Sequence, residues 1–218
     1  RSALERFLAP EVVELVSANP EEVRLGGTNA KVSILFADIR GFTTLSESLP
    51  PEKIVEMLNE YFTRATEVIF EHGGTLDKYL GDGLMALFGA PVSKGNDAGN
   101  ALRAALGIQQ LMTELNHEGT ARGWPDLRVG IGVTTGVVTA GNIGSPKRID
   151  YTVVGDAVNV SARLCANAQP GQILVSESTV AEVTGLFQLK PLDAIQLKGK
   201  SRPLPVFSVL GDQAAAKK

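Results

Sequence analysis

Two aspartates, Asp38 and Asp82, are the residues whose type and setting most clearly suggest chemistry. Asp38 ends an apolar, strand-like run over residues 32–38, and Asp82 lies in a Gly-Asp-Gly turn at 81–83. Either aspartate alone would be explained by its local turn. If the fold brings the two carboxylates together, they repel each other unless cations lie between them. Carboxylate pairs that hold metal against phosphate oxygens point to phosphoryl or nucleotidyl chemistry.

The elements around this pair predict an α+β fold with a ferredoxin-like core and a mainly antiparallel sheet flanked by helices. In chain order we expect a strand ending at residue 38, a helix over 51–72, a hairpin over 75–88, a helix over 97–115 and a strand over 128–135. This β-α-β-β-α-β order is that of ferredoxin-like folds, whose first and third strands are antiparallel neighbours. The topology itself is therefore expected to place Asp38 beside Asp82.

The rest of the chain predicts a C-terminal extension and two terminal segments. The extension is expected to comprise a strand over 137–143 paired with its predecessor, a loop over 144–149, a helix over 157–167 and strands near 173–175, 187–198 and 204–210. We divide the chain into a helical lead-in or linker over 1–30, a domain over 31–210 and a flexible tail over 211–218.

Two further groups of residues suit phosphate chemistry. Asn159 and Arg163 are four residues apart and therefore share one face of the expected helix. Such a pair is often only a solvated polar stripe, but a guanidinium beside an amide suits the charge that builds on a reacting phosphorus. Behind Asp38, residues 40–43 open a helical turn whose backbone N–H groups could cradle a phosphate.

The composition narrows the class of protein. The chain has 218 residues, 44% hydrophobic and 21% charged, as in an ordinary globular protein. Its net charge of −3 does not suggest a nucleic-acid partner. Its single cysteine excludes an intrachain disulfide and fits a reducing, cytoplasmic compartment. No apolar run of about 18 residues is present, so we expect no membrane contact in this segment. Because the chain begins with Arg1, we expect a piece of a longer protein with an upstream regulatory domain.

Four segments in this order resemble the catalytic domain of class III nucleotidyl cyclases, the adenylyl/guanylyl cyclase homology domain, over about residues 31–210. The segments are residues 36–43 (FADIRGFT), 77–82 (DKYLGD), 155–163 (GDAVNVSAR) and Lys198 in its Leu-Lys-Gly context. The resemblance implies attack of a ribose 3′-hydroxyl on the α-phosphate with loss of pyrophosphate, assisted by two divalent ions, Mg²⁺ or Mn²⁺.

The resemblance also implies the role of each site residue. Asp38 and Asp82 match the metal-binding aspartates, with help from the carbonyl of Ile39. Asn159 matches the residue that orients the ribose, and Arg163 matches the one that stabilises the transition state. The expected substrate-binding residues are Lys78, Thr152, Lys198, Arg128, Gly41, Phe42 and Thr43.

Base recognition favours ATP. In the family, Lys78 would meet adenine N1 and Thr152 the N6 amine. Many members have Asp at the Thr152 position, but the Lys/Thr pair resembles a bacterial subgroup of adenylyl cyclases. Guanine would set its N1–H against the lysine donor, at a cost of about 1–3 kcal/mol. Guanylyl or mixed specificity remains an alternative, as does a catalytically silent domain for dimerisation or regulation.

The resemblance implies a homodimer with two shared sites. In this family the metal-binding aspartates come from one domain, and the lysine, asparagine and arginine come from the other. This chain carries both sets, so two copies would form two equivalent sites. Lys78 and Asp82, neighbours in one expected hairpin, would then serve different sites.

Overall fold

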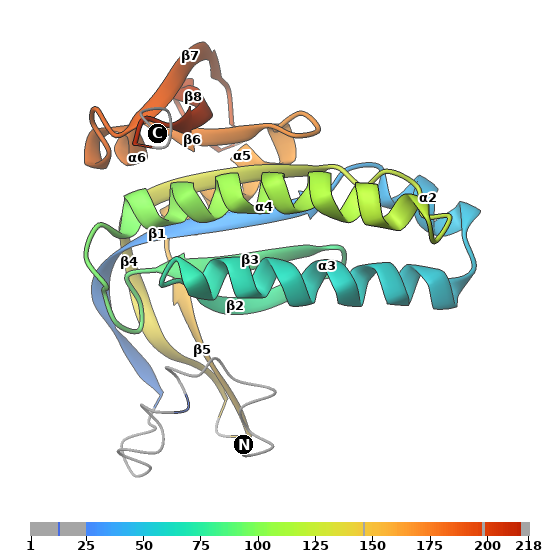
Figure 1. Ribbon diagram of the computed structural model, residues 1–218. Coiled ribbons are helices and arrows are strands. Elements are labelled where there is room, and N and C mark those ends of the chain that lie inside the picture. The colour runs from blue at the N-terminus through green and yellow to red at the C-terminus, as the bar shows by residue number, and fades with distance from the viewer. Residues whose placement is uncertain (1–12, 14–24, 146, 198, 215–218) are drawn as a thin grey trace.

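The computed structural model describes residues 13, 25–145, 147–197 and 199–214. Its centre is an eight-stranded sheet in the order β2-β3-β1-β4-β6-β8-β7, with β5 paired to β4 (Figure 1). The strands are β1 Gly26–Ile39, β2 Thr75–Leu80, β3 Gly83–Phe88, β4 Val129–Ser145, β5 Arg148–Val154, β6 Ile173–Ser176, β7 Phe187–Ile195 and β8 Leu204–Asp212. In the described part of the chain the helices are α2 Phe42–Ser48, α3 Pro51–Glu71, α4 Asp97–Thr120, α5 Asp156–Asn167 and α6 Glu177–Glu182. Within β2, β3, β1 and β4 the expected ferredoxin-like arrangement is confirmed.

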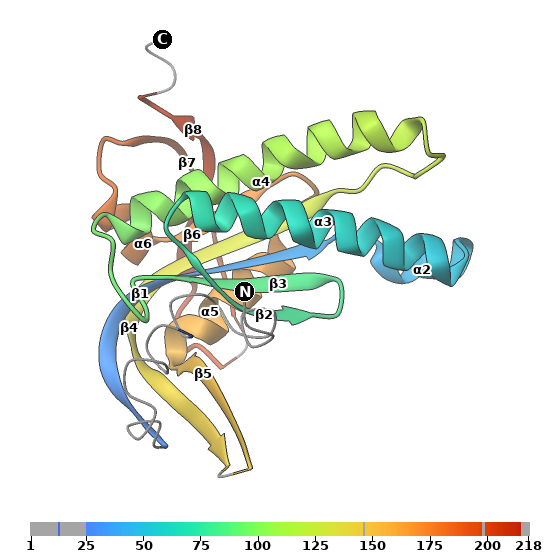
Figure 2. The ribbon, with the colours of Figure 1, turned by 60° about the horizontal axis from the view of Figure 1, so that its bottom comes forward.

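Helices cover both faces of this sheet because the buried strands are apolar on both sides. In β1, Leu35 and Ala37 belong to the large core beneath α3 and α4, whereas Val32 and Ile34 pack in a second core with Ala157 of α5. This alternation follows the two-residue period of a strand. The central strands are thus held between α3 and α4 on one side and α5 on the other (Figure 2).

The predicted break between residues 135 and 137 does not exist. Gly136 stays in the ladder opposite Val32, so the two expected strands are one strand, β4, and the first does not pair with the second. The distal half of β4 pairs instead with β5, which begins at Arg148 inside the expected loop. Together with the start of β1, these strands form an arm that projects from the sheet (Figures 1 and 2).

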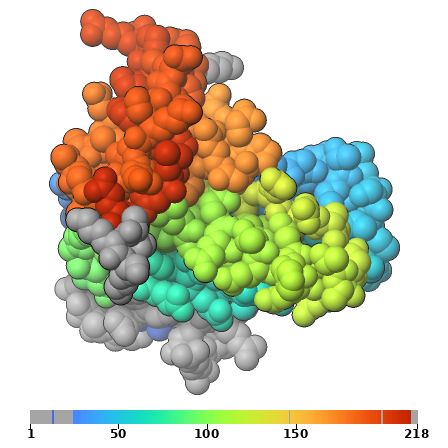
Figure 3. Space-filling view, turned by 45° about the horizontal axis from the view of Figure 1, so that its top comes forward, coloured from blue at the N-terminus to red at the C-terminus, as the bar shows by residue number. Residues whose placement is uncertain are grey.

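The boundaries of the predicted segments also shift. β1 begins at Gly26, so residues 26–30 belong to the sheet rather than to a helical lead-in; apart from residues 13 and 25, the rest of that lead-in lies outside the described residues. β8 continues to Asp212, two residues into the expected tail. The short helix α6 was not predicted. The C-terminal strands form a lobe above α4, opposite the end that carries α2 (Figure 3).

Among the described residues, no helix combines the length and apolarity needed to cross a bilayer.

Candidate active site

The two aspartates meet at the edge of the sheet where β1 ends and β3 begins. Asp38 lies opposite Gly83 in the antiparallel ladder, next to Asp82 in the β2–β3 turn. Gly81 has a φ of 65°, in the left-handed region that such a turn requires. A Cβ on Gly83 would lie 2.9 Å from Asp38 Oδ1. Gly83 therefore leaves room for the Asp38 carboxylate, and the Gly-Asp-Gly sequence is explained by the site as well as by the turn.

The carboxyl groups of Asp38 and Asp82 are close enough to interact. Burial, followed by the neighbouring Asp82, raises the pKa of Asp38, while Arg40 acts in the opposite direction. Arg40 Nη1 lies 3.7 Å from Asp38 Oδ2, and the Asp38 side chain is still 42% exposed. The negative charge of Asp38 is thus only partly compensated and the carboxylate is open to solvent, as expected of a place where a cation binds.

The donor set of this edge fits Mg²⁺ or Mn²⁺. Both side chains offer oxygen, which these hard cations prefer. Within the described part of the chain, no group of three or more His, Cys, Asp or Glu residues converges on one point. Further ligands must therefore come from backbone carbonyls, from water or from substrate oxygens. The carbonyl of Ile39, the residue after Asp38, is one candidate.

The sheet edge that carries Asp38 and Asp82, here called the metal edge after its expected ligand, is backed by tightly packed residues. The Arg40 guanidinium donates to the carbonyl of Cys165 on α5, and it lies against Gly130, where a Cβ would collide with it. Burial raises the pKa of Cys165 to about 12, so this thiol stays protonated at neutral pH and is no nucleophile. The fully buried Tyr61 completes this layer, and burial likewise raises the pKa of its phenol.

Helix α5 is fixed on the sheet by one buried hydroxyl. Ser161 Oγ shares its one proton between the carbonyls of Ile34, at 2.7 Å, and Gly132, at 2.9 Å. Gly132 permits this approach because a Cβ there would collide with the backbone of α5. Asn159 is exposed, and Arg163 is half-buried with its guanidinium about 4 Å from a Cβ built on Gly199. Lys198, the residue before Gly199, lies outside the described residues.

Within one chain the two halves of the predicted site are separate. Among the described residues, no hydrogen bond or ion pair joins Asn159 or Arg163 to either metal-edge aspartate. The side of α5 nearest Asp38 carries Ala162 instead, which helps line an apolar cavity of about 180 Å³ beside Asp38.

The expected base-binding residues do come together. Lys78 on β2 and Thr152 on β5 both contact Asp77, a residue to which sequence reasoning assigned no role. Thr152 Oγ1 donates to Asp77 Oδ2 at 2.6 Å, and Lys78 Nζ lies 3.6 Å from Asp77 Oδ1. The acidic residue directly before the expected base-binding lysine was the available signal.

The remaining candidates lie around the metal edge. Gly41, with φ 69°, caps the start of α2, so Phe42 and Thr43 occupy its first turn, where backbone N–H groups lack intrahelical partners. Arg128 is exposed just before β4, and its carbonyl accepts from the Arg40 N–H at 2.7 Å.

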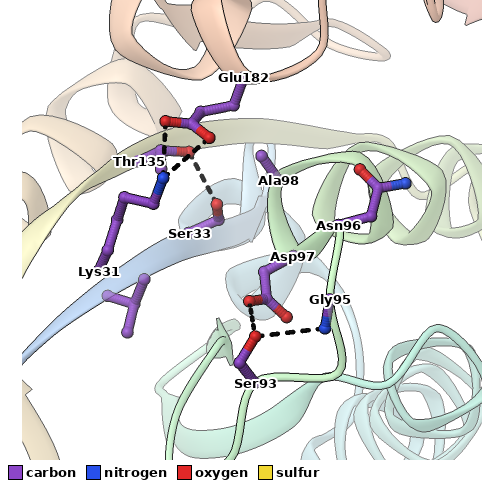
Figure 4. A pocket seen from close by; sticks show the side chains of 10 residues that line it. Lys31, Ser33, Ser93, Gly95, Asn96, Asp97, Ala98, Thr135 and Glu182 are labelled. Atoms are coloured by element: carbon purple, nitrogen blue, oxygen red, sulfur yellow. Dashed lines mark hydrogen bonds and ion pairs between the residues drawn. The ribbon is translucent and has the colours of Figure 1, made fainter.

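A second cavity of about 160 Å³ lies near the start of α4 (Figure 4). Its polar side chains largely satisfy one another. Lys31 pairs with Glu182 at 2.9 Å, and Ser33 hydrogen-bonds Thr135 at 2.7 Å. Asp97 accepts from a neighbouring serine at the helix start. None of these contacts indicates a ligand.

The fold and the paired carboxylates define a class of protein, and comparison with known proteins agrees. The sequence profile of the family described as "Adenylate and Guanylate cyclase catalytic domain" matches residues 27–210. The chain belongs to this family.

Individual relatives include both kinds of cyclase. The chain is 36% identical to "Adenylate cyclase 1" of Rhizobium meliloti (strain 1021) over 97% of its own length, but it spans only 32% of that protein. The solved adenylyl cyclase CyaB from P. aeruginosa is 34% identical with a TM-score of 0.83, covering 85% of this chain and 96% of that one. The solved guanylyl cyclase Cya2 is 40% identical with a TM-score of 0.83, covering 86% and 95%. The predicted family and fold class are confirmed.

Proposed function

We propose that this domain is an adenylyl cyclase that converts ATP to 3′,5′-cyclic AMP and pyrophosphate. The observation that carries the proposal is the meeting of Asp38 and Asp82 at one open sheet edge, in a chain that also presents Asn159 and Arg163 on a helix fixed to the same sheet. The family and its adenylate cyclase relatives support the same chemistry.

Asp38, Asp82 and the Ile39 carbonyl would hold two divalent ions, Mg²⁺ or Mn²⁺. When bound, these ions would lower the pKa of the ribose 3′-hydroxyl and neutralise charge on the triphosphate. Asp38 contributes an open carboxylate, with the Arg40 guanidinium 3.7 Å away. The first turn of α2 supplies backbone N–H groups on the side where phosphate oxygens would lie.

The α5 residues would act on the reacting phosphate. Asn159 would orient the ribose, and the guanidinium of Arg163 would stabilise negative charge on the oxygens of the α-phosphorus as the 3′-oxygen attacks in line. Arg128 and Lys198 would bind the triphosphate. Helix α5 is suited to this work because Ser161 ties it to two strands, so its polar face is held rigidly.

The site would be shared between two copies of the chain. Ala162, rather than Arg163, lines the cavity beside Asp38 of the same chain. This supports a site in which Asn159 and Arg163 would act at the metal edge of another copy. In a two-fold symmetric dimer this arrangement produces two equivalent sites. Residues 31–210 would form the catalytic unit, and regulation by other parts of a longer protein fits the fraction of its relatives that the chain spans.

Lys78 and Thr152 would read the base. Lys78 would donate to adenine N1, and the Thr152 oxygen would accept from the N6 amine. GTP is the competing substrate, because the guanylyl cyclase Cya2 is 40% identical to this chain. The lysine favours ATP, since guanine would leave its buried N1–H facing another donor.

The test is product identification with purified domain, ATP or GTP, and Mg²⁺ or Mn²⁺. We expect cyclic AMP and pyrophosphate from ATP, and about one-tenth or less of that activity with GTP. Equal or greater production of cyclic GMP would overturn the base assignment. No product from either nucleotide, from folded protein at micromolar concentration, would contradict the proposed activity.

A further inference from the structure

We propose that Asp77 is a positioning residue for substrate choice: it fixes the direction of the Thr152 hydrogen bond and so selects a purine that donates at its 6-position. The inference rests on the proposed function, which places Thr152 against the base. Asp77 itself would not touch the nucleotide.

Asp77 owes its position to a bulge in β2. Leu76 lies opposite Ala86, whereas Lys78 lies opposite the adjacent Met85, so Asp77 is the extra residue on its strand. A bulge of this kind re-aims side chains that regular alternation would send to opposite faces. Here both Asp77 and Lys78 reach the same place, with their charged groups 3.6 Å apart.

The Asp77 carboxylate is buried and fully engaged. Its side chain is only 1% exposed, one oxygen accepts from Thr152 at 2.6 Å, and the other faces the Lys78 ammonium. Burial raises the pKa of Asp77, and the exposed Asp150 adds to this effect, whereas the Thr152 hydrogen bond and Lys78 favour the ionised form. The two partners thus stabilise the charge that burial disfavours.

This contact fixes the direction in which the Thr152 hydroxyl hydrogen-bonds, which threonine alone does not. A hydroxyl carries one donor and two acceptor lone pairs, so a freely rotating Thr152 could donate to guanine O6 as readily as it accepts from adenine N6. An ionised carboxylate can only accept. Because the Thr152 hydroxyl donates its proton in a hydrogen bond to Asp77, Thr152 presents lone pairs to the base. Adenine's amine is then satisfied, while the guanine carbonyl would be left facing lone pairs.

A purely structural role for Asp77 makes a different prediction. The hydrogen bond also joins β2 to β5, through Asp77 and Thr152, which are 75 residues apart in the chain. If that connection were its whole purpose, loss of Asp77 would lower activity on ATP and GTP by the same factor. If Asp77 sets polarity, its loss changes the ratio between the two substrates.

The central variant is Asp77→Asn, whose amide can donate to Thr152 and free the hydroxyl to donate to guanine. We expect the ratio of kcat/KM for ATP to that for GTP to fall about ten-fold. The matched control is Asp150→Asn, which removes the same charge from a carboxylate on β5 that pairs with Arg148 at 3.8 Å. Its ratio should stay within about two-fold of the unchanged protein.

A second variant tests whether Asp77 acts through Thr152. In a Thr152→Val background, Asp77→Asn should leave the ATP-to-GTP ratio unchanged, because the group that it orients is gone. An equal effect in both backgrounds, or an equal loss on both nucleotides in the single variant, would overturn the inference. If Asp77→Asn does not fold, Thr152→Val decides instead: it should reduce kcat/KM selectively for ATP, and an equal loss on GTP would contradict the inference.

Failure of the proposed function is visible separately. Wild-type protein that prefers GTP refutes both the ATP assignment and the role of Asp77. Wild-type protein without product refutes the activity alone, and the role of Asp77 is then judged by displacement of a fluorescent nucleotide with ATP and GTP. A selective loss of ATP affinity in Asp77→Asn would support it, and an unchanged affinity ratio would overturn it.

Discussion

Asp38 and Asp77, which lie near the two ends of the β2–β3 hairpin region, have opposite electrostatic surroundings. At the end of β1, Asp38 lies beside the carboxylate of Asp82 at the hairpin tip, whereas at the bulge in β2 Asp77 contacts a hydroxyl and an ammonium. Burial is the main cause that raises the pKa of both Asp38 and Asp77. The next cause differs in sign: Asp82 raises the pKa of Asp38 further, and the Thr152 hydrogen bond lowers that of Asp77.

This difference separates two uses of the same residue type. A carboxylate whose neighbours do not neutralise its charge is suited to bind a cation. The space that Gly83 leaves beside Asp38 gives a cation access to that carboxylate. A carboxylate that is neutralised internally cannot serve a ligand directly, but it can orient the groups around it. The comparison can be tested by removing each feature in turn.

Asp38→Asn should have the largest effect, because it removes a proposed metal ligand. We expect activity to fall by at least about a hundred-fold. A matched control is Asp193→Asn, an exposed carboxylate on β7, which should keep wild-type activity. Full activity in the Asp38 variant would contradict the assignment of the metal edge.

The same variant should be more stable than wild type when metal is absent. The folded-state pKa of Asp38 is raised above the unfolded value, so ionisation opposes folding, and stability is lost as pH rises through the folded pKa. Asparagine abolishes that loss. Thermal denaturation near neutral pH should therefore show a higher Tm for Asp38→Asn without metal, and a smaller rise on adding Mn²⁺ than wild type shows.

Arg163→Ala should lower kcat by about a hundred- to a thousand-fold with little change in KM, because its charge matters most in the transition state. Arg64→Ala on α3 is the matched control. It breaks surface ion pairs with Glu114 and Glu118 and should cost less than about 1 kcal/mol of stability with no loss of kcat. A rise in KM alone for Arg163→Ala would indicate a binding role instead.

Ser161→Ala should have the smallest effect on substrate choice. Loss of its two buried hydrogen bonds should destabilise the fold by about 1–3 kcal/mol, measured by urea denaturation. The exposed Thr63→Ala, which loses one bond within α3 at 2.7 Å, should cost less. A shifted ATP-to-GTP ratio in Ser161→Ala would show that selectivity responds to any loosening of the sheet, and would weaken the specific role given to Asp77.

The sequence was sufficient to predict the ferredoxin-like core and the neighbouring positions of Asp38 and Asp82. That pairing follows from strand order, and the structure confirms that Asp38 lies opposite Gly83. The arm formed by β4 and β5 was not predicted because glycine is compatible with both a turn and an extended strand. Gly136 adopts the second, where it pairs with Val32 of β1 in a ladder that local sequence does not reveal.

Asp77 was beyond sequence reasoning for a different reason. The role proposed for Asp77 depends on a bulge between Leu76 and Lys78 and on a partner, Thr152, from a distant strand. Neither is visible in local residue patterns. The roles of Asn159 and Arg163 remain predictions from the family resemblance, supported by their position on α5.

The most direct test of the account is complementation between two inactive chains, Asp38→Ala and Arg163→Ala. If each site draws its aspartates from one copy and its arginine from the other, a mixed dimer contains one intact site. Random mixing in equal amounts should restore about a quarter of wild-type specific activity, since half the dimers are mixed and half their sites are intact. No recovery, in dimers confirmed by mass to be mixed, would contradict a site shared between two copies of this chain.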